Sequence, residues 1–311
     1  MVNSQIENRK KVNRKFTNET VIVLTASAAF LLFQSLVVGL IPAQVLMVAL
    51  FLLMFFASGW SRRLAVALLP FVVFEVSYDW MRLCPNYMVN DIDVRGLYET
   101  EKSLFGIVLP EYFYAHHCTL ADLLTGLAYL CWVPGPIALG LWLYFTGHRR
   151  EYLHFAVAFL VVNWIGFAIY YIHPAAPPWF VIEHGFEPIL GTPGSAAGLV
   201  RFDELIGLPV FQSIYVNNSN IFAALPSLHA AYMLIATIYA IRSRCPRWLI
   251  AVCIVITVGI WIAAVYTCHH YLIDVLLGIV TAFLGVFLFE HLLMRLRPVK
   301  RFMAAYERYI S

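Results

Sequence analysis

Charged residues are scarce in this chain of 311 residues. Only 13% of the chain is Asp, Glu, Lys or Arg, whereas 61% is hydrophobic. A soluble domain of this length cannot cover so much apolar surface, so the composition excludes an ordinary soluble protein. The sequence also has no internal repeat, no low-complexity tract and no separate soluble domain. We therefore expect an all-α fold, a polytopic bundle of transmembrane helices.

The patterns of a metal site are absent as well. The six cysteines are scattered and form no Cys-x-x-Cys pair, so a zinc site is not expected. No acidic cluster resembles a magnesium site, and we expect neither a metal nor another cofactor. Cys84 and Cys118 bracket a large loop and could be oxidised to a disulfide. The alternative, small packing residues, is the commoner role of cysteine in membranes.

Eight apolar segments are predicted to cross a bilayer, which takes about 20 residues each. The first follows a basic stretch, as the apolar part of a signal peptide would. It is about twenty residues long and lacks a clear cleavage site, so we interpret it as a retained span. The predicted spans are Glu19–Leu40, Ala43–Trp60, Leu64–Cys84, Leu120–Phe145, Tyr152–Ile172, Phe222–Ile241, Trp248–Thr267 and Tyr271–Met294.

Basic residues predict the orientation of this bundle. With the N-terminus in the cytoplasm, all but four of the 21 Lys and Arg residues fall on the cytoplasmic side. This satisfies the positive-inside rule, so we expect both termini in the cytoplasm. The net charge of +3 then reflects anchoring at anionic lipid head groups, and no nucleic-acid partner is expected. The four exceptions are Arg82, Arg95, Lys102 and Arg201.

The same pattern divides the chain into a basic cytoplasmic tail at 1–18, a single transmembrane domain at 19–294 and a second basic tail at 295–311. Two large loops, Pro85–Thr119 and His173–Ile221, fall on the outer side. They are rich in proline, glycine and aromatic residues, so we expect ordered caps over the membrane.

Two strings on the outer side contain the residues for a chemical step: Leu225-Pro226-Ser227-Leu228-His229 and His269-His270-Tyr271-Leu272-Ile273-Asp274. Asp274 follows His270 at i+4, so the two side chains share a helix face. The carboxylate can fix the imidazole tautomer and make the other ring nitrogen a better nucleophile. This arrangement suits an attack on phosphorus that gives a phosphohistidine.

His229 is a candidate acid and base for the same step. It follows Ser227 at a predicted helix start, where free N–H groups and the helix dipole can hold a phosphate oxygen. His229 could protonate the departing alkoxide and later take the proton of an acceptor hydroxyl. Any one of these residues alone would more often be an interfacial histidine or a helix cap. Their combination, with a costly Asp274 near the bilayer, favours catalysis.

These strings resemble the second and third signature motifs of the type-2 phosphatidic acid phosphatase superfamily. The resemblance covers about Tyr152 to Met294 and implies a catalytic core at 120–294. It also implies that His229 is the acid and base, His270 the nucleophile and Asp274 the orienting carboxylate. The chain departs from the usual motifs, because Ala263 and Ala264 stand where Ser-Arg is usual. The stretch from Gly166 to His173-Pro174 replaces a lysine and Arg-Pro, so three phosphate-gripping cations are missing.

The departures are similar to those of inositol phosphorylceramide synthases. The strings that carry this resemblance are His173-Pro174-Ala175-Ala176-Pro177-Pro178-Trp179, Ser77-Tyr78-Asp79-Trp80-Met81-Arg82 and the doubled His269-His270. With this subgroup, the resemblance extends over about Leu64–Met294. It implies transfer of phosphoinositol from phosphatidylinositol to a ceramide or dihydroceramide hydroxyl, with release of diacylglycerol. The implied partners are these lipids and the membrane; no protein partner is indicated.

Candidate substrate-binding residues surround the motifs: Ser227, Arg82, Asp79, His173, His269 and Trp179. Arg82 either faces the phosphate or is a snorkelling arginine paired to Asp79. Trp179 is expected as an interfacial anchor, with a lid over the head group as the alternative. Lys102 and Arg201 are expected as solvated loop charges. Glu75 is costly inside a span, so it either supports Arg82 or lies in a polar bundle interior.

The sequence leaves three functions open. The first is the lipid phosphotransferase. The second is a lipid phosphate phosphatase that uses water as acceptor, and the third is a transporter or receptor in which the histidines bind protons or a ligand. The missing cations favour a diester donor with one phosphate charge over a dianionic monoester. We expect an integral membrane protein with an extracytoplasmic site, in a bacterial inner membrane or a Golgi membrane.

Overall fold

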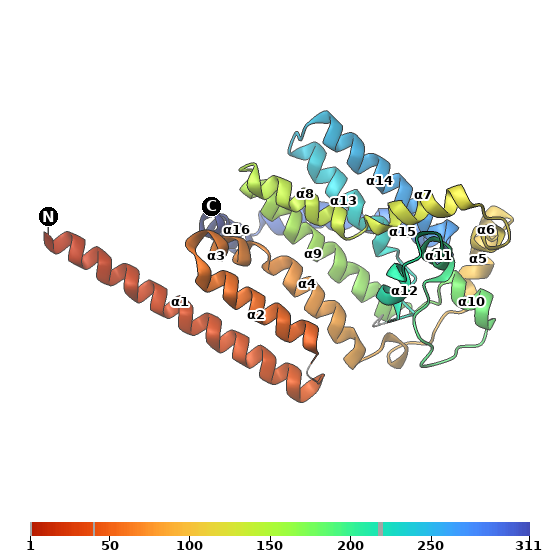
Figure 1. Ribbon diagram of the computed structural model, residues 1–311, viewed down its shortest axis with the longest axis horizontal. Helices are drawn as coiled ribbons and strands as arrows, with labels where there is room; N and C mark the ends of the chain where they lie inside the picture. Colours follow the sequence, from red (N-terminus) through yellow and green to blue (C-terminus); the bar gives the residue numbers. More distant parts are fainter. Residues whose placement is uncertain (1, 40, 217–219) are drawn as a thin grey trace. The chain divides into compact units, whose positions relative to one another are not determined.

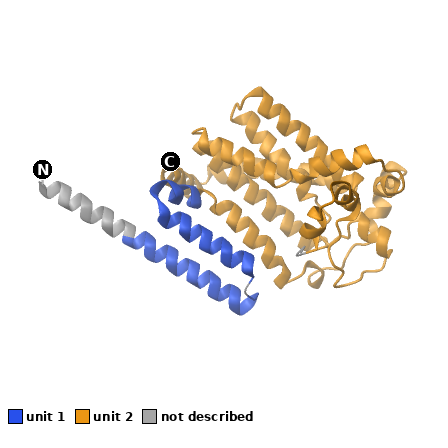
Figure 2. Ribbon diagram, in the orientation of Figure 1, with its two compact units in different colours: residues 1–66 blue, residues 67–311 orange. Residues whose placement is uncertain are grey.

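The computed structural model describes residues 2–39, 41–216 and 220–311. Over these ranges it is helical, and two isolated β-bridges are its only extended pairings (Figure 1). The chain divides into two compact units, residues 1–66 and 67–311 (Figure 2). Unit 1 contains α1 (Val2–Val37) and α2 (Pro42–Ala57), and α3 (Gly59–Ala67) ends at its boundary. All the candidate site residues lie in unit 2.

Unit 2 is a bundle of long apolar helices. Short helices gather at the end of the bundle where α13 and α15 begin (Figure 1). The long apolar helices are α4 (Leu69–Asp79), α7 (Thr119–Leu130), α8 (Pro134–Phe145), α9 (Arg149–Ile172), α13 (Leu228–Arg242), α14 (Arg247–Tyr266) and α15 (Leu272–Phe287). They are followed by α16 (Arg297–Ile310), which is amphipathic and basic. The short ones are α5 (Gly96–Phe105), α6 (Leu109–Ala115), α10 (Pro178–His184), α11 (Val200–Ile206) and α12 (Val210–Tyr215).

Four helical segments of the described chain are long and apolar enough to span a membrane by themselves: Thr17–Val37, Arg149–Ile172, Arg247–Tyr266 and Leu272–Arg295. The number rises to 6 if α3 with α4, and α7 with α8, each form one broken span. The chain is therefore an integral membrane protein with several apolar helices. The other two predicted spans correspond to shorter apolar helices, α2 and α13. Proline helps explain the break between α7 and α8, because α8 begins at Pro134.

The two large loops consist of short helices and turns. Pro85–Thr119 contains α5 and α6, and His173–Ile221 contains α10, α11 and α12. Cys84 and Cys118 are both free thiols, so the disulfide that the sequence left open is not formed. The sequence also predicts that the run Asn217-Asn218-Ser219-Asn220 caps the sixth span; its first three residues lie outside the described residues.

The N-termini of α13 and α15 lie against each other. The Ser227 backbone N–H donates to the carbonyl oxygen of Asp274 at 2.9 Å. Gly278 permits this approach, because a Cβ at that position would lie 2.2 Å from the Ser227 carbonyl oxygen. Backbone atoms cannot move aside as a flexible side chain can, so glycine is required here for close helix packing. This contact brings His229 and His270, 41 residues apart in sequence, to one place.

Candidate active site

A tight turn after α14 presents the two adjacent histidines. The backbone N–H groups of His269 and His270 both donate to the carbonyl oxygen of Ala264, at 3.1 and 2.9 Å. Cys268 has φ +62°, the left-handed conformation that non-glycine residues rarely adopt, and this reverses the chain. The turn is held from the loop side, because the N–H groups of Trp179 and Gly198 donate to the carbonyls of Cys268 and Thr267. The histidines are therefore fixed by backbone contacts.

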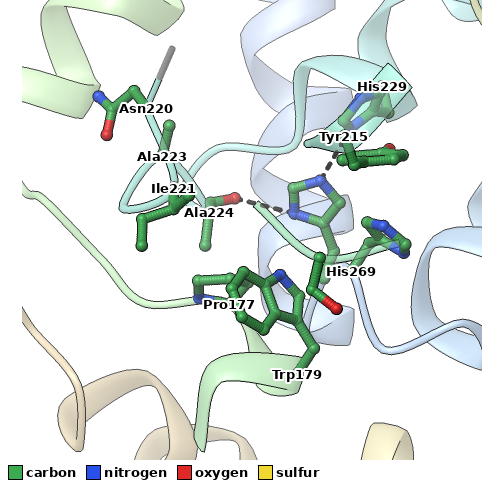
Figure 3. Close-up of a pocket in the computed structure, with 11 residues that line it drawn as sticks. Pro177, Trp179, Tyr215, Asn220, Ile221, Ala223, Ala224, His229 and His269 are labelled. Carbon is green, nitrogen blue, oxygen red and sulfur yellow. Dashed lines mark hydrogen bonds between the residues drawn. The ribbon is translucent and has the colours of Figure 1, made fainter. Parts of the chain in front are cut away.

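His229 and His270 are in direct contact. Nδ1 of His229 lies 3.0 Å from Nε2 of His270, and Nδ1 of His270 lies 3.0 Å from the carbonyl oxygen of Ala224 (Figure 3). A carbonyl can only accept, so Nδ1 of His270 carries a hydrogen and donates it. In neutral His270, Nε2 then has the lone pair and accepts from His229. Nε2 is the atom of His270 that can attack phosphorus.

The environment of His270 disfavours protonation of its Nε2 atom. The side chain is 4% exposed, and burial lowers the pKa of His270 to about 4, although the hydrogen bond to Ala224 opposes that shift. His270 is therefore neutral at physiological pH and needs no deprotonation before it attacks.

Asp274 lies close to His270, but its carboxylate accepts a hydrogen bond from the backbone at the start of α15. Its Oδ2 accepts the backbone N–H of Tyr271 at 2.8 Å, as part of a capping box at the N-terminus of α15. The same oxygen lies 3.6 Å from Nδ1 of His270, beyond hydrogen-bond distance. Asp274 is 0% exposed, so in its ionised form it acts on the imidazole through a poorly screened interior. The sequence assigned the orienting contact to Asp274; the hydrogen bond is made by Ala224.

The His173–Trp179 string holds Ala224 in place. Ala175 donates its N–H to the Phe222 carbonyl at 3.0 Å and accepts the N–H of Ala224 at 3.3 Å. The side-chain amide of Asn86 also donates to the Phe222 carbonyl, at 2.7 Å. These contacts fix the extended segment that presents the Ala224 carbonyl to His270. Nothing in the sequence around Ala224 indicates that role, since any residue has a carbonyl.

His269 has one ring nitrogen available to a ligand. Its Nδ1 lies 3.0 Å from Oγ1 of Thr267, whose hydroxyl donates to the Ala263 carbonyl at 2.7 Å. Because the Thr267 hydrogen is used there, His269 Nδ1–H is the donor and Nε2 has the lone pair. Burial lowers the pKa of His269, so the ring is neutral. Nε2 is buried and has no hydrogen-bond partner among the described residues, so it can accept from a substrate hydroxyl.

The three histidines line a pocket with about 370 Å³ of empty space, partly open to solvent. In Figure 3, Trp179 and Pro177 lie at the bottom of the view, Ala224 at the left, and His229 and Tyr215 at the top. The neighbours of the histidines are mostly aromatic. The Tyr215 ring lies 4.5 Å from that of His269, and the Trp132 ring packs edge-on against His229 at 4.6 Å. Sequence analysis found His229, His269, His270 and Trp179 but missed Tyr215 and Trp132.

The other substrate-binding candidates do not line this pocket. Ser227 is the N-cap of α13 and its Oγ accepts the N–H of Ala230 at 3.3 Å, as expected for a cap. Arg82 forms an ion pair with Asp79. His173 lies 3.0 Å from the Asp93 carboxylate and is 42% exposed. Each of these three residues thus has a partner within the chain, and none of them lines the pocket.

Arg201 differs from its predicted role as a solvated charge. Its Nε donates to Oδ1 of Asp122 at 2.7 Å, and the side chain is only 17% exposed. The ion pair joins α11 to α7. Among the described residues, the pocket lining contains neither Lys nor Arg. The cations missing from the sequence motifs are therefore not replaced by basic side chains from elsewhere in that lining.

Glu101, on α5, caps the N-terminus of α15 from another helix. Its Oε2 accepts the backbone N–H of Ile273 at 3.2 Å, in the first turn of α15. The side chain is 0% exposed, and burial raises the pKa of Glu101 to about 7, with the charge of Asp274 adding to the rise. Sequence analysis missed this residue, because the contact joins positions 172 apart.

Comparisons with known proteins show the family of this chain. The family model described as PAP2 superfamily matches residues 95–288, more than half of the chain. A phosphoinositol dihydroceramide synthase of Bacteroides thetaiotaomicron is 56% identical over 300 residues, which cover 94% of this chain and 98% of that protein. No solved structure matches.

More distant relatives are fungal. An inositol phosphorylceramide synthase of Candida albicans is 31% identical over 71% of this chain and 46% of its own length. The catalytic subunit of the Saccharomyces cerevisiae inositol phosphorylceramide synthase is 28% identical over 69% of this chain and 54% of its own length. The chain thus spans about half the length of these fungal relatives.

Proposed function

Because this chain belongs to the PAP2 superfamily, we propose that it is a lipid phosphotransferase that moves phosphoinositol from phosphatidylinositol to a ceramide or dihydroceramide hydroxyl. The observation that carries the proposal is the 56% identity, over nearly the whole of both chains, to a phosphoinositol dihydroceramide synthase. The contact between the histidines of the two motifs supplies a mechanism for it.

His270 attacks first. Its Nε2 lone pair forms a bond to phosphorus, and the bond from phosphorus to the diacylglycerol oxygen breaks. The His270 ring becomes positively charged, and its Nδ1–H remains bonded to the Ala224 carbonyl at 3.0 Å. The Asp274 carboxylate, 3.6 Å from the same nitrogen, stabilises that charge. The product of this half-reaction is a phosphoinositol group on His270.

His229 handles the proton in both half-reactions. Protonated beside the bound phosphate anion, which favours the charged imidazole, His229 gives a proton to the departing diacylglycerol alkoxide and becomes neutral. The acceptor hydroxyl then attacks phosphorus, the bond to His270 breaks, and neutral His229 takes the hydroxyl proton. The cycle ends with both histidines in their starting forms. The substrate phosphate must first separate the two rings, because they occupy the space where it reacts.

The head group fits the remaining pocket chemistry. The N-terminus of α13 supplies a positive dipole end for the single phosphate charge. The lone pair of His269 Nε2 accepts a hydrogen bond from an inositol hydroxyl. A phosphate monoester carries two charges, and a lining without Lys or Arg among the described residues suits it poorly. This favours a synthase over the second candidate, a lipid phosphate phosphatase.

We also propose that the site faces away from the cytoplasm, in a bacterial inner membrane or, for a eukaryotic protein, a Golgi membrane. Support comes from the distribution of Lys and Arg, which leaves only four on that side. The proposed domain organisation is the one expected from the sequence, with basic tails at 1–18 and 295–311 and a transmembrane domain at 19–294 whose catalytic core is 120–294.

A reconstitution experiment tests the function. The purified chain receives inositol-labelled phosphatidylinositol in mixed micelles, with and without dihydroceramide. We expect a lipid product that holds inositol, phosphate and dihydroceramide together, formed only when the acceptor is present. Phosphatidic acid serves as the competing substrate. Rapid release of inorganic phosphate from it, with no dependence on dihydroceramide, would support the phosphatase instead.

A further inference from the structure

A second and larger cavity adjoins the first in unit 2. It contains about 1050 Å³ of empty space and is partly open. Its walls come from α4, α9, α12, α13 and the link between α7 and α8, and they include the aromatic rings of Phe74, Trp132, Tyr170 and Tyr232. An aromatic and aliphatic lining of this size suits the body of a lipid.

The two cavities meet at His229. That residue lines both of them, as do Tyr215, Asn220 and Ala223, whereas His270 lines only the first. In a displacement at phosphorus, the leaving oxygen lies opposite the attacking nitrogen. That oxygen must therefore be next to His229, the proton donor. The lipid attached to the oxygen extends away from His270, and the second cavity is the space on that side.

One cavity then serves two alcohols in turn. Diacylglycerol leaves from it after the first half-reaction, and the acceptor enters it for the second. Both alcohols meet the same His229, first as acid and then as base. Diacylglycerol that stays in the cavity reverses the reaction, so forward transfer requires the cavity to prefer the acceptor.

Glu75 can distinguish the acceptor alcohol from diacylglycerol. It lies on α4 and lines the cavity beside Phe74 and Tyr78. Among the described residues, no hydrogen bond or ion pair engages its carboxylate. A carboxylate within an apolar helix of a membrane protein is costly and marks a functional site by default. The mechanism described above does not use it, so a ligand with hydrogen-bond donors is the natural partner.

The two alcohols differ in the hydrogen-bond donors that lie near the reacting oxygen. Around its free hydroxyl, diacylglycerol has ester oxygens, which only accept. A ceramide-type alcohol has an amide N–H and a second hydroxyl close to its primary hydroxyl, and both can donate. An ionised carboxylate only accepts. It therefore gains charge-assisted hydrogen bonds from the ceramide-type alcohol and none from the ester oxygens of diacylglycerol.

We propose that the second cavity is the acceptor site and that Glu75 selects a ceramide-type alcohol by accepting hydrogen bonds from its amide N–H and second hydroxyl. The proposal rests on the proposed function and names the residue that distinguishes its acceptor. In the step it serves, the primary hydroxyl oxygen bonds to phosphorus. The phosphorus–nitrogen bond breaks, its electron pair returns to His270, and the hydroxyl proton passes to His229.

Glu75→Gln tests the proposal, with Glu204→Gln as the matched control. Glu204 is exposed on α11 and lines neither cavity. Two readouts separate the half-reactions: the burst of diacylglycerol from phosphatidylinositol without acceptor, and the rate of transfer at varied dihydroceramide. For Glu75→Gln we expect the burst to stay within about twofold of the original protein. We expect KM for dihydroceramide to rise about tenfold or more, the loss typical of one hydrogen bond to a charged group. Glu204→Gln changes neither.

Acceptor analogues identify the contact itself. Dihydroceramide that is N-methylated, or that lacks the second hydroxyl, should react about tenfold less efficiently than dihydroceramide with the original protein. With Glu75→Gln the penalty for the analogues should shrink several-fold, because a neutral amide oxygen accepts a hydrogen bond more weakly than a carboxylate does.

Three results would overturn the proposal. They are an equal loss of burst and transfer in Glu75→Gln, an unchanged KM for dihydroceramide, and an analogue penalty as large in the variant as in the original protein. Failure of the proposed function looks different, because the original protein would then form no inositol-containing product from dihydroceramide at all.

Discussion

Nδ1 of His229 lies 3.0 Å from Nε2 of His270, so the proposed proton donor and the proposed nucleophile occupy each other's reactive positions when no substrate is present. The contact keeps the attacking lone pair hydrogen-bonded until a phosphate group separates the rings.

Asp274→Asn should lower kcat strongly while the chain still folds. The amide oxygen of Asn can accept the Tyr271 N–H that Asp274 accepts at 2.8 Å, so the helix start is kept. The negative charge 3.6 Å from His270 is lost. Orienting carboxylates beside catalytic histidines elsewhere are worth up to about 10⁴ in rate. Since the hydrogen bond to Ala224 remains, we expect a smaller loss, of about 10²- to 10³-fold.

The measurement is steady-state transfer to dihydroceramide, with the thermal unfolding midpoint of the purified variant as a check on folding. An Asn variant with full activity and an unchanged midpoint would remove Asp274 from the mechanism and leave Ala224 as the only partner of His270.

His229→Ala should slow the step that needs a proton and spare the step that does not. With phosphatidylinositol we expect a loss of about 10²- to 10⁴-fold in diacylglycerol release, the usual contribution of a general acid. A nitrophenyl ester of phosphoinositol has a leaving group that departs without a proton, so its burst should fall much less. If both esters slow equally, His229 has a structural role only.

Labelling at Glu187, an exposed residue in the loop after α10, tests on which side of the membrane the site lies. In a background with Ser at Cys84 and Cys118, Glu187→Cys should react with an impermeant maleimide in intact cells. Arg247→Cys, on the predicted cytoplasmic side, should react only after permeabilisation. The reverse pattern would place the active site in the cytoplasm and contradict the positive-inside assignment.

Glu101 should make stability depend on pH. Its pKa is about 7 in the folded chain against an ordinary 4.5, so between these values the folded state holds a proton that the unfolded state has lost. Unfolding then releases a proton, and stability falls as pH rises from about 5 to 8. The shift corresponds to at most about 3 kcal/mol.

Thermal unfolding at pH 5 and pH 8 measures this effect. Glu101→Gln should flatten the dependence, because the amide does not titrate. Glu99→Gln, an exposed position on the same helix α5, should leave the dependence as it is. Equal pH slopes for all three proteins would show that Glu101 does not titrate in this range.

The side chains that the sequence predicts as reacting groups lie together in the structure, and the sequence could point to them because such chemistry depends on side-chain type and short spacing. His270 and Asp274 are four residues apart on one helix, and His229 follows a helix-capping Ser227. Apolar segment length likewise predicted helical membrane spans, although two of the eight are shorter helices and two are broken. Local patterns were sufficient for these features.

Other features depend on contacts that local patterns do not record. The Ala224 carbonyl orients His270, and a backbone oxygen has no sequence signal. Glu101 reaches α15 from α5, and Arg201 pairs with Asp122 across 79 residues, so both contacts follow from the tertiary fold. The prediction that Arg201 is a solvated loop charge was wrong, because the ion pair with Asp122 allows the Arg201 side chain to be buried.

Trapping the intermediate tests the central claim most directly. The purified chain is mixed with phosphatidylinositol labelled in the inositol ring, without acceptor, and quenched in alkali, in which phosphohistidine survives. Mass spectrometry should find phosphoinositol on the peptide that contains His270, and added dihydroceramide should remove it as labelled product. His270→Ala should form no adduct. An adduct on another residue, or an adduct that persists in His270→Ala, would contradict the account.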